Sequence, residues 1–486
     1  MSYLDLSIEE LHALLVNKTV TPLMLAQEAI ERAKNDTNNA FETILEKEAL
    51  EYAATLTEVE EDNVFWGIPY VAKDNFSTKD VLTTASSNIL HDYVPVFDAT
   101  VIKKLKAAKA VLIGKVTLDE LAMGGTGTTG HLGITYNPYD PSHTYMVGGS
   151  SCGSASAVAA GIVPFSLGSD TGDSVRKPAS YAGLVGLKPT WGRISRFGLF
   201  PFAPSLDHVG YFTRNVKDSA LLLNLLAGRD ELDSTSSVKP VDNYLDYLNV
   251  DVKTKKVAVL KTIVEGVESK EVKESFENTV EHLKSKGVQV DYVDFSYDLL
   301  KSVLAVYLVI SSAEATSNNA NLDGIKFGLR EGNESSYQEV MFNARTKGFS
   351  ELIKRRFVLG SYSLYKANLD KLFAPAQKAR RLIVNKVNEL FETYDAIYIP
   401  AVAEVRNPIE GRKGKSELFN IVENVLAIGN FGGFPSLTLP IGLDNNFPYG
   451  ANLTCRPFDE VTLFALSSTI EESTNLKDLT VRKVGL

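Results

Sequence analysis

The sequence predicts an α/β protein with a largely internal sheet. Short apolar runs at 68–72 and 110–114 have the length and composition of buried strands. An amphipathic segment at 99–109 separates these runs and has helical spacing. Strands that alternate with helices are typical of layered α/β folds. Length and composition agree, because 486 residues with 44% hydrophobic and 23% charged residues suit a large folded core.

The N-terminal part, residues 5–60, is expected to be helical. Apolar residues recur at helical spacing from Leu6 to Leu15, and a second such pattern runs from Thr21 to Ala33. Thr21 followed by Pro22 has the form of an N-cap with proline at the first helical position.

The second half contains further predicted strands and helices. Strands are expected at 257–260, 288–293 and 394–400, and an amphipathic helix at 270–286 is expected to end at Gly287. With no internal repeat in the sequence, we expect a single domain over 1–486. It would comprise an N-terminal helical region at about 1–60 and a catalytic Gly/Ser-rich core at about 65–215.

Bulk properties narrow the class of protein. The formal net charge is −10, so the chain as a whole gains no electrostatic attraction to nucleic acid. The two cysteines, Cys152 and Cys455, indicate neither a disulfide framework nor a cysteine-rich zinc site. The N-terminus lacks a signal-peptide pattern, and no run of about eighteen apolar residues predicts a membrane span. We therefore expect a cytoplasmic protein that does not bind membranes.

Residues 123–214 are rich in Gly, Ser and Thr and are interleaved with apolar residues, which favours a tightly packed catalytic centre over a linker. Lys73 follows the predicted strand at 68–72. A buried lysine loses its proton readily and then acts as a general base. The alternative for this segment alone is a surface lysine paired with Asp74.

Two glycine-rich segments carry hydroxyl groups. Residues 148–154, Gly-Gly-Ser-Ser-Cys-Gly-Ser, precede a helix of small residues, and their alternative interpretation is an N-cap and loop. Residues 168–179 place Ser174 in a turn, where it suits the role of a nucleophile. The amides of Thr171, Gly172 and Asp173 would then donate to an oxyanion. The alternative there is an ordinary polar turn.

Together, these three segments resemble the amidase-signature family. The resemblance rests on Val-Ala-Lys-Asp-Asn at 71–75, the Gly-Gly-Ser-Ser run, the twenty-four-residue step from Ser150 to Ser174, and the segments 183–190 and 192–198. It implies a large mixed central sheet covered by helices on both faces. It also implies catalysis by Lys73 as base, Ser150 as proton relay and Ser174 as acylated nucleophile, with no metal and no cofactor in this chain.

Within the family, the sequence is similar to the A subunits of aspartyl/glutamyl-tRNA amidotransferases. The shared segments are 97–100, 119–125, 205–207, 314–318, 323–324 and 354–360. This implies a glutamine amidase that supplies ammonia to B- and C-type partner subunits, with tRNA bound and ATP used only by a partner. Arg356 would then bind the α-carboxylate of glutamine, Glu423 its α-amino group, and Tyr307 would line the substrate pocket.

Several residues depart from the family pattern. The family has Pro at the positions of Val147 and Tyr211, and Gly at those of Cys152 and Asp173. It has an acidic residue at the position of Thr128, Gln at that of Lys177 and Asp at that of Glu423. Asp173 precedes the nucleophile, and its charge would oppose an oxyanion unless it reaches outward to a cation such as Lys177. Two other hypotheses stay open. One is a free-standing amidase or diverged paralogue with another amide substrate, and the other is a catalytically weak scaffold.

Overall fold

The computed structural model describes residues 3–330, 332–411 and 415–486, without the side chain of Leu418. Eleven strands of the described chain form one mixed sheet in the order β1-β3-β2-β4-β6-β5-β10-β11-β9-β7-β8. The strands are β1 (Phe41–Ile44), β2 (Pro69–Lys73), β3 (Val111–Val116), β4 (Phe165–Asp170), β5 (Val185–Lys188), β6 (His208–Thr213), β7 (Lys256–Leu260), β8 (Gln289–Val293), β9 (Ala396–Pro400), β10 (Ser436–Asp444) and β11 (Phe447–Cys455). The large mixed sheet confirms the predicted fold class.

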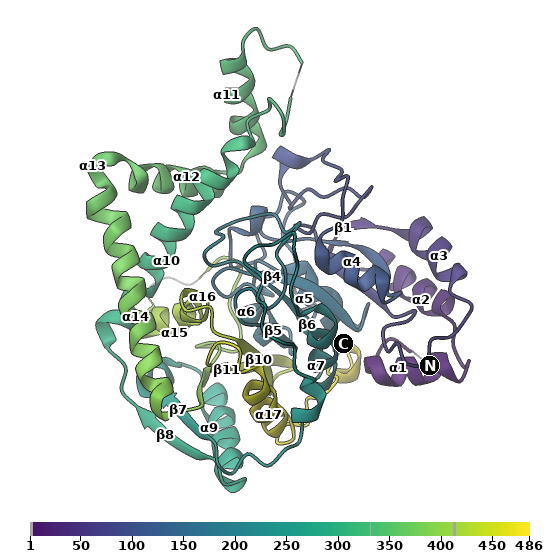
Figure 1. Cartoon of the computed structure of the whole chain (residues 1–486), viewed down its shortest axis with the longest axis vertical. Helices are drawn as coiled ribbons and strands as arrows, with labels where there is room; N and C mark the ends of the chain where they lie inside the picture. The colour runs from purple at the N-terminus through teal and green to yellow at the C-terminus, as the bar shows by residue number, and fades with distance from the viewer. Residues whose placement is uncertain (1–2, 331, 412–414) are drawn as a thin grey trace.

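Helices surround this sheet, with α1–α3 at one end of the molecule and α10–α14 at the other (Figure 1). They are α1 (Ile8–Val16), α2 (Pro22–Lys34), α3 (Glu46–Thr55), α4 (Thr100–Ala107), α5 (Cys152–Ala159), α6 (Arg176–Tyr181), α7 (Val216–Leu226), α8 (Lys261–Gly266), α9 (Lys270–Ser285), α10 (Tyr297–Asn318), α11 (Tyr337–Gly348), α12 (Glu351–Leu364), α13 (Lys366–Asn368), α14 (Ala374–Thr393), α15 (Glu417–Asn424), α16 (Ile428–Phe431) and α17 (Glu460–Glu471).

Strand direction brings the catalytic segments together. β2 pairs in parallel with β3 on one side and with β4 on the other. The carboxyl ends of parallel strands meet at the same edge of a sheet. Lys73 is the last residue of β2 and Asp170 the last of β4, so the base and the turn that carries Ser174 lie at one edge.

Most predicted elements agree with the structure. Thr21 caps α2, because its hydroxyl accepts a hydrogen bond from the Met24 amide at 3.2 Å. α9 ends just before Gly287, which has a φ of +86° that favours glycine. The prediction that residues 5–60 are helical was wrong at 41–44. There β1 forms an antiparallel edge strand against β3, and a four-residue strand is too short to display an alternating pattern.

Among the described residues, one helical segment, Tyr297–Asn321, which begins with α10, is long and apolar enough to cross a membrane by length and composition alone. It packs against α12 and α14, and 44% of its most apolar window is buried inside the protein. A core helix of a globular protein passes the same test, so α10 is weak evidence for a membrane span.

Candidate active site

Lys73 is completely buried at the end of β2. Its Nζ atom lies 2.7 Å from the Ser150 hydroxyl and 2.9 Å from the hydroxyls of Ser151 and Ser169. Removal from water lowers the pKa of Lys73 to about 7, because burial disfavours the charged ammonium. The structure excludes the alternative of a surface lysine paired with Asp74, since Asp74 pairs with Lys115 at 3.0 Å.

Ser150 lies in a loop that is held by Asp119. The carboxylate of Asp119 accepts hydrogen bonds from the amides of four consecutive residues, 126–129, and its own amide donates to the Ser150 carbonyl at 3.1 Å. The Gly149–Ser150 peptide bond is cis. A Cβ on Gly149 would lie 2.0 Å from Asp119 Oδ2, so only glycine fits beside this carboxylate.

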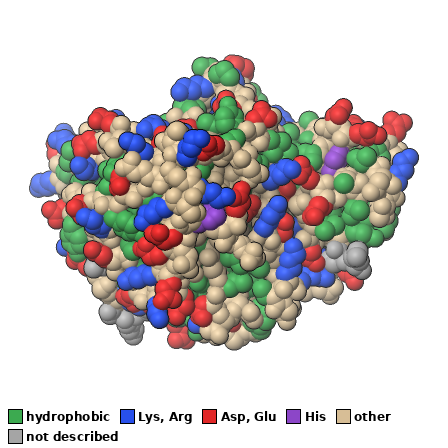
Figure 2. Space-filling model, turned by 90° about the horizontal axis from the view of Figure 1, so that it is seen from below, with side chains coloured by type: hydrophobic (Ala, Val, Ile, Leu, Met, Phe, Trp, Pro, Cys, Tyr) green, Lys and Arg blue, Asp and Glu red, His purple; other side chains and the backbone are tan. Residues whose placement is uncertain are grey.

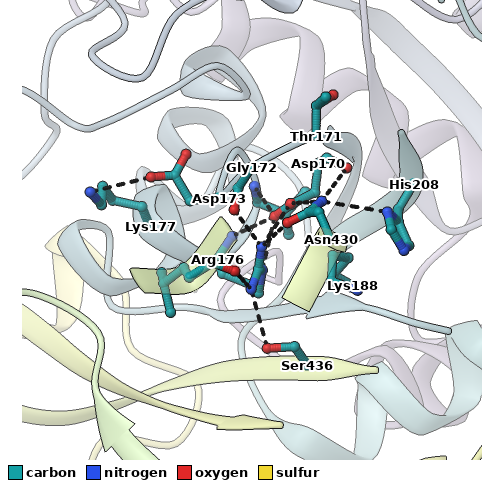
Figure 3. A network of polar contacts seen from close by, with 12 residues as sticks. Asp170, Thr171, Gly172, Asp173, Arg176, Lys177, Lys188, His208, Asn430 and Ser436 are labelled. Atoms are coloured by element: carbon teal, nitrogen blue, oxygen red, sulfur yellow. Dashed lines mark hydrogen bonds and ion pairs between the residues drawn. The ribbon is translucent and has the colours of Figure 1, made fainter. Parts of the chain in front are cut away.

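The turn that carries Ser174 is fixed by a buried ionic network (Figure 3). Arg176 contacts Asp170 through Nε at 3.1 Å and through NH2 at 2.9 Å, and it donates to the Gly172 carbonyl at 2.8 Å. The Asn430 amide also donates to Asp170 at 2.9 Å. Burial alone would raise the pKa of Asp170, but Arg176 and these hydrogen bonds outweigh it and hold the pKa below its ordinary value.

Ser174 is buried beside the Ser150 loop, and its carbonyl accepts a hydrogen bond from the Ser151 amide at 3.2 Å. The implied proton relay requires a chain of hydrogen bonds from Lys73 through Ser150 to Ser174. The first link is confirmed, whereas the hydroxyls of Ser150 and Ser174 are not hydrogen-bonded to each other in the described structure. Such links are often long in ligand-free enzymes and tighten when substrate binds.

Backbone donors lie next to Ser174. Within the described residues, the amides of Gly172, Asp173 and Ser174 donate to no protein acceptor. The Thr171 hydroxyl donates to Asp207 at 2.6 Å, which fixes the start of the turn. Free N–H groups beside a nucleophile can serve as the donors that an oxyanion requires. The predicted oxyanion roles of Thr171, Gly172 and Asp173 stay predictions.

A cavity of about 280 Å³ opens beside this turn and contains all three predicted substrate residues, Tyr307, Arg356 and Glu423, together with Asp173 and Lys177. Gly172 packs against Tyr307, because a Cβ on Gly172 would lie 2.9 Å from the ring. The substrate roles of these residues stay predictions, but the structure brings them into one cavity.

Asp173 reaches Lys177, as we expected. Its carboxylate lies 3.2 Å from Lys177 Nζ, and Figure 3 shows both side chains turned away from the Asp170–Arg176 cluster. Asp173 and Lys177 also both line the cavity, so their ion pair forms part of the cavity wall.

Three residues around the base, Ser151, Ser169 and Asn75, were not assigned a role from the sequence. The Ser169 hydroxyl contacts Lys73 and also accepts a hydrogen bond from the Asn75 side chain at 2.9 Å. Asn75 belongs to the Val-Ala-Lys-Asp-Asn segment at 71–75. Their positions in the sequence could have indicated a place in the site, since Asn75 follows the end of β2 and Ser169 lies next to the end of β4.

A buried lysine that is hydrogen-bonded to a serine, beside a glycine-rich turn with free amides, defines the class of enzyme as a serine amidohydrolase. Comparison with known proteins agrees: the model of the amidase family matches residues 24–464. The chain belongs to the amidase family.

Individual relatives match over nearly the whole chain. The A subunit of glutamyl-tRNA(Gln) amidotransferase from Streptococcus mutans is 39% identical, over 98% of this chain and 97% of its own length. The protein of the same name from Pediococcus pentosaceus is 40% identical, over 98% of both chains. Among solved structures, the A subunit of glutamyl-tRNA(Gln) amidotransferase from Thermotoga maritima has a TM-score of 0.80 and 35% identity, covering 98% of this chain and 96% of that one.

Proposed function

We propose that this chain is the glutamine-hydrolysing A subunit of a tRNA-dependent amidotransferase. The observation that carries the proposal is the 2.7 Å contact between a buried Lys73 and Ser150, beside a cavity that contains a guanidinium nitrogen without a described partner. The names of the relatives supply the tRNA-dependent reaction.

In the proposed mechanism, the Ser174 hydroxyl attacks the carboxamide carbon of the substrate. Its proton passes through Ser150 to the neutral amine of Lys73, and the amides of Thr171, Gly172 and Asp173 stabilise the oxyanion. Return of the proton to the leaving nitrogen releases ammonia and leaves an acyl ester on Ser174. Water, deprotonated along the same relay, then hydrolyses the ester to a free carboxylate.

Substrate is held by the charged groups of the cavity. Arg356 would bind a carboxylate, because a guanidinium matches carboxylate geometry and its NH1 atom is buried without a described partner. Glu423 would face the α-amino group, and Tyr307 would pack beside the reacting amide.

Partners and location follow from the proposed role. B- and C-type subunits would receive the ammonia, bind tRNA and use ATP in the cytoplasm. The formal net charge of −10 supports tRNA binding by a partner, and basic and acidic side chains are interspersed on the face seen in Figure 2. The single sheet to which strands from 41 to 455 contribute supports one domain over 1–486.

The second candidate is a free-standing amidase with a different amide substrate. The acidic–basic pair Asp173–Lys177 in the cavity favours it, since this pair replaces two uncharged residues of the family pattern. The third hypothesis, a weak scaffold, conflicts with the intact contact between Lys73 and Ser150.

Ammonia release from glutamine, asparagine and simple amides, with and without B- and C-type subunits, tests the proposal. We expect glutamine turnover that increases with the partners and disappears in Ser174→Ala. Lys73→Ala should reduce it by ~10²–10⁴-fold, the contribution of general acid–base catalysis. Equal turnover by the wild type and Ser174→Ala would refute the mechanism. Turnover of simple amides alone, without any effect of partners, would favour the free-standing amidase.

A further inference from the structure

Four charged side chains line the cavity beside Ser174: Asp173, Lys177, Arg356 and Glu423. Lys177 lies between the two acids, with Nζ 3.2 Å from Asp173 Oδ2 and 3.2 Å from Glu423 Oε2. Nζ also donates to the backbone carbonyl of Glu423. A lysine ammonium has three N–H donors, so these three acceptors use all of them.

The acids are correspondingly occupied. Glu423 accepts from Lys177 through Oε2 and from the Ala403 amide through Oε1 at 2.9 Å. Burial lowers the pKa of Lys177, but Glu423 and Asp173 outweigh it and raise the pKa above its ordinary value. Lys177 therefore stays protonated and offsets part of the negative charge that Asp173 and Glu423 bring to the cavity wall.

Arg356, unlike Lys177, has a donor without an acceptor among the described residues. Its NH1 atom is buried and has no hydrogen-bond partner among the described residues, and none of the described carboxylates forms an ion pair with it. Arg356 is half-buried, and its buried NH1 donor lacks an acceptor within the described residues, so an anionic group on a ligand would supply one.

We infer that the cavity selects primary amides that carry an anionic group for Arg356 and does not require a cationic group on the substrate, because the ammonium of Lys177 already contacts both acids. The substrate class is the ω-monoamides of dicarboxylic acids, with or without an α-ammonium group. This inference rests on the proposed amidase function and deepens it.

A substrate ammonium gains little at the acids. It would enter as a second cation beside Lys177, and like charges a few ångströms apart repel. Lys177 is also covalently tethered, so it has the advantage of a high effective concentration over a free ligand. The structure thus assigns Lys177 as a specificity-determining residue.

The test compares glutamine, glutarate monoamide and butyramide as substrates of the full chain, with partner subunits present. These amides share a primary carboxamide but differ in the carboxylate and the ammonium. We expect kcat/KM for glutamine and glutarate monoamide to agree within about tenfold and both to exceed that for butyramide by at least about hundredfold.

Lys177→Gln should raise the ratio of kcat/KM for glutamine to kcat/KM for glutarate monoamide by at least about tenfold. The change should arise mainly in KM. Asp173→Asn/Lys177→Gln, which removes both charges of the pair, should show the same shift, whereas Lys177→Arg should keep the wild-type ratio. Lys415→Gln is the matched control. Lys415 also bridges two glutamates, Glu268 and Glu404, but does not line the cavity. It should leave the ratio unchanged.

A binding measurement tests this inference independently of the proposed function, because it does not require hydrolysis of the amide. Calorimetric titration of Ser174→Ala with glutamine and with glutarate monoamide reports selectivity without turnover. The inference would be supported if Ser174→Ala bound the two amides with similar Kd values, and if Ser174→Ala/Lys177→Gln bound glutarate monoamide more weakly than glutamine. Both results would hold even if no amide were hydrolysed. A preference for glutamine above about hundredfold in the wild type, or a ratio that Lys177→Gln does not move, would overturn it.

Discussion

The Nζ atom of Lys73 lies 2.7 Å from Oγ of Ser150, and neither side chain is exposed to solvent. Ser151 and Ser169 hold the amine from two other directions. A neutral amine donates two hydrogen bonds and accepts one, so this arrangement allows Ser150 to donate its proton to Lys73. We therefore expect the protonation state of Lys73 to affect both activity and stability.

The rate of amide hydrolysis should depend on the ionisation of Lys73. Burial lowers the pKa of Lys73 to about 7, and only the neutral amine acts as a base. We expect kcat/KM to rise with pH through about 7 and to reach a plateau above it. Initial rates at constant ionic strength from about pH 5.5 to 9 test this. A rate that is flat across this interval would show that Lys73 is not the titrating base.

The ionisation of Lys73 should also make the stability of the protein depend on pH. The folded-state pKa of Lys73 lies below the ordinary lysine value of 10.5, so the unfolded chain binds one more proton between about pH 7 and 10.5. The free energy of unfolding of the wild type should therefore rise with pH in this interval relative to Lys73→Met, by up to ~1.4 kcal/mol per pH unit.

Denaturant unfolding of both proteins at several pH values above 7 measures this slope. The comparison of slopes does not depend on the hydrogen bonds that Lys73→Met removes, because those losses are equal at every pH. Parallel curves would mean that Lys73 stays charged in the folded protein.

The Asp170–Arg176 pair should contribute strongly to stability. Both side chains are completely buried and lie 2.9 Å apart. Arg176→Met leaves the Asp170 carboxylate without its cation, which should reduce the free energy of unfolding by ~3–5 kcal/mol. Lys261→Met is the control, since Lys261 forms an ion pair with Asp294 at the surface and should change stability by less than ~1 kcal/mol. Equal effects in denaturant titrations would contradict the proposed role of burial.

Close packing between Gly172 and Tyr307 should be required for activity. A Cβ at residue 172 would lie 2.9 Å from Cε2 and 3.0 Å from Cζ of the Tyr307 ring. Gly172→Ala should move the turn and reduce kcat/KM by about 10–100-fold, since small displacements of catalytic groups are costly. Gly172→Ala/Tyr307→Leu should recover part of the loss relative to Tyr307→Leu alone. No recovery would indicate that the clash with Tyr307 is not the cause.

The sequence predicted the parts of this site that are local in the chain. Lys73 follows an apolar strand, and Ser150 and Ser174 lie in glycine-rich turns, so each was a candidate from neighbouring residues, but their roles came from the family resemblance of the three segments together. Local sequence patterns do not show which residues far apart in the chain contact each other. Lys177 contacts Glu423 across 246 residues, and no periodicity connects the two. The role of Asp119 was also not predicted, because it depends on the close approach of Gly149.

The last prediction concerns the charge that precedes the nucleophile. An unpaired Asp173 carboxylate would repel the oxyanion that forms on the substrate, by ~1–4 kcal/mol depending on the local dielectric. Lys177 lies 3.2 Å from this carboxylate and offsets the repulsion. Lys177→Gln should therefore reduce kcat for glutamine by about tenfold, equivalent to ~1.4 kcal/mol of transition-state energy. Asp173→Asn should change kcat by less than about threefold, because the carboxylate that it removes is already neutralised.

The double variant Asp173→Asn/Lys177→Gln is decisive, because it removes the repelling charge together with its partner. We expect its kcat to return to within about threefold of the wild type, so that the two substitutions are strongly non-additive. Single-turnover measurements of acyl-enzyme formation isolate the chemical step from product release. If the double variant were as slow as Lys177→Gln alone, the loss would come from the missing lysine itself. In that case Lys177 would act on the substrate and not through Asp173.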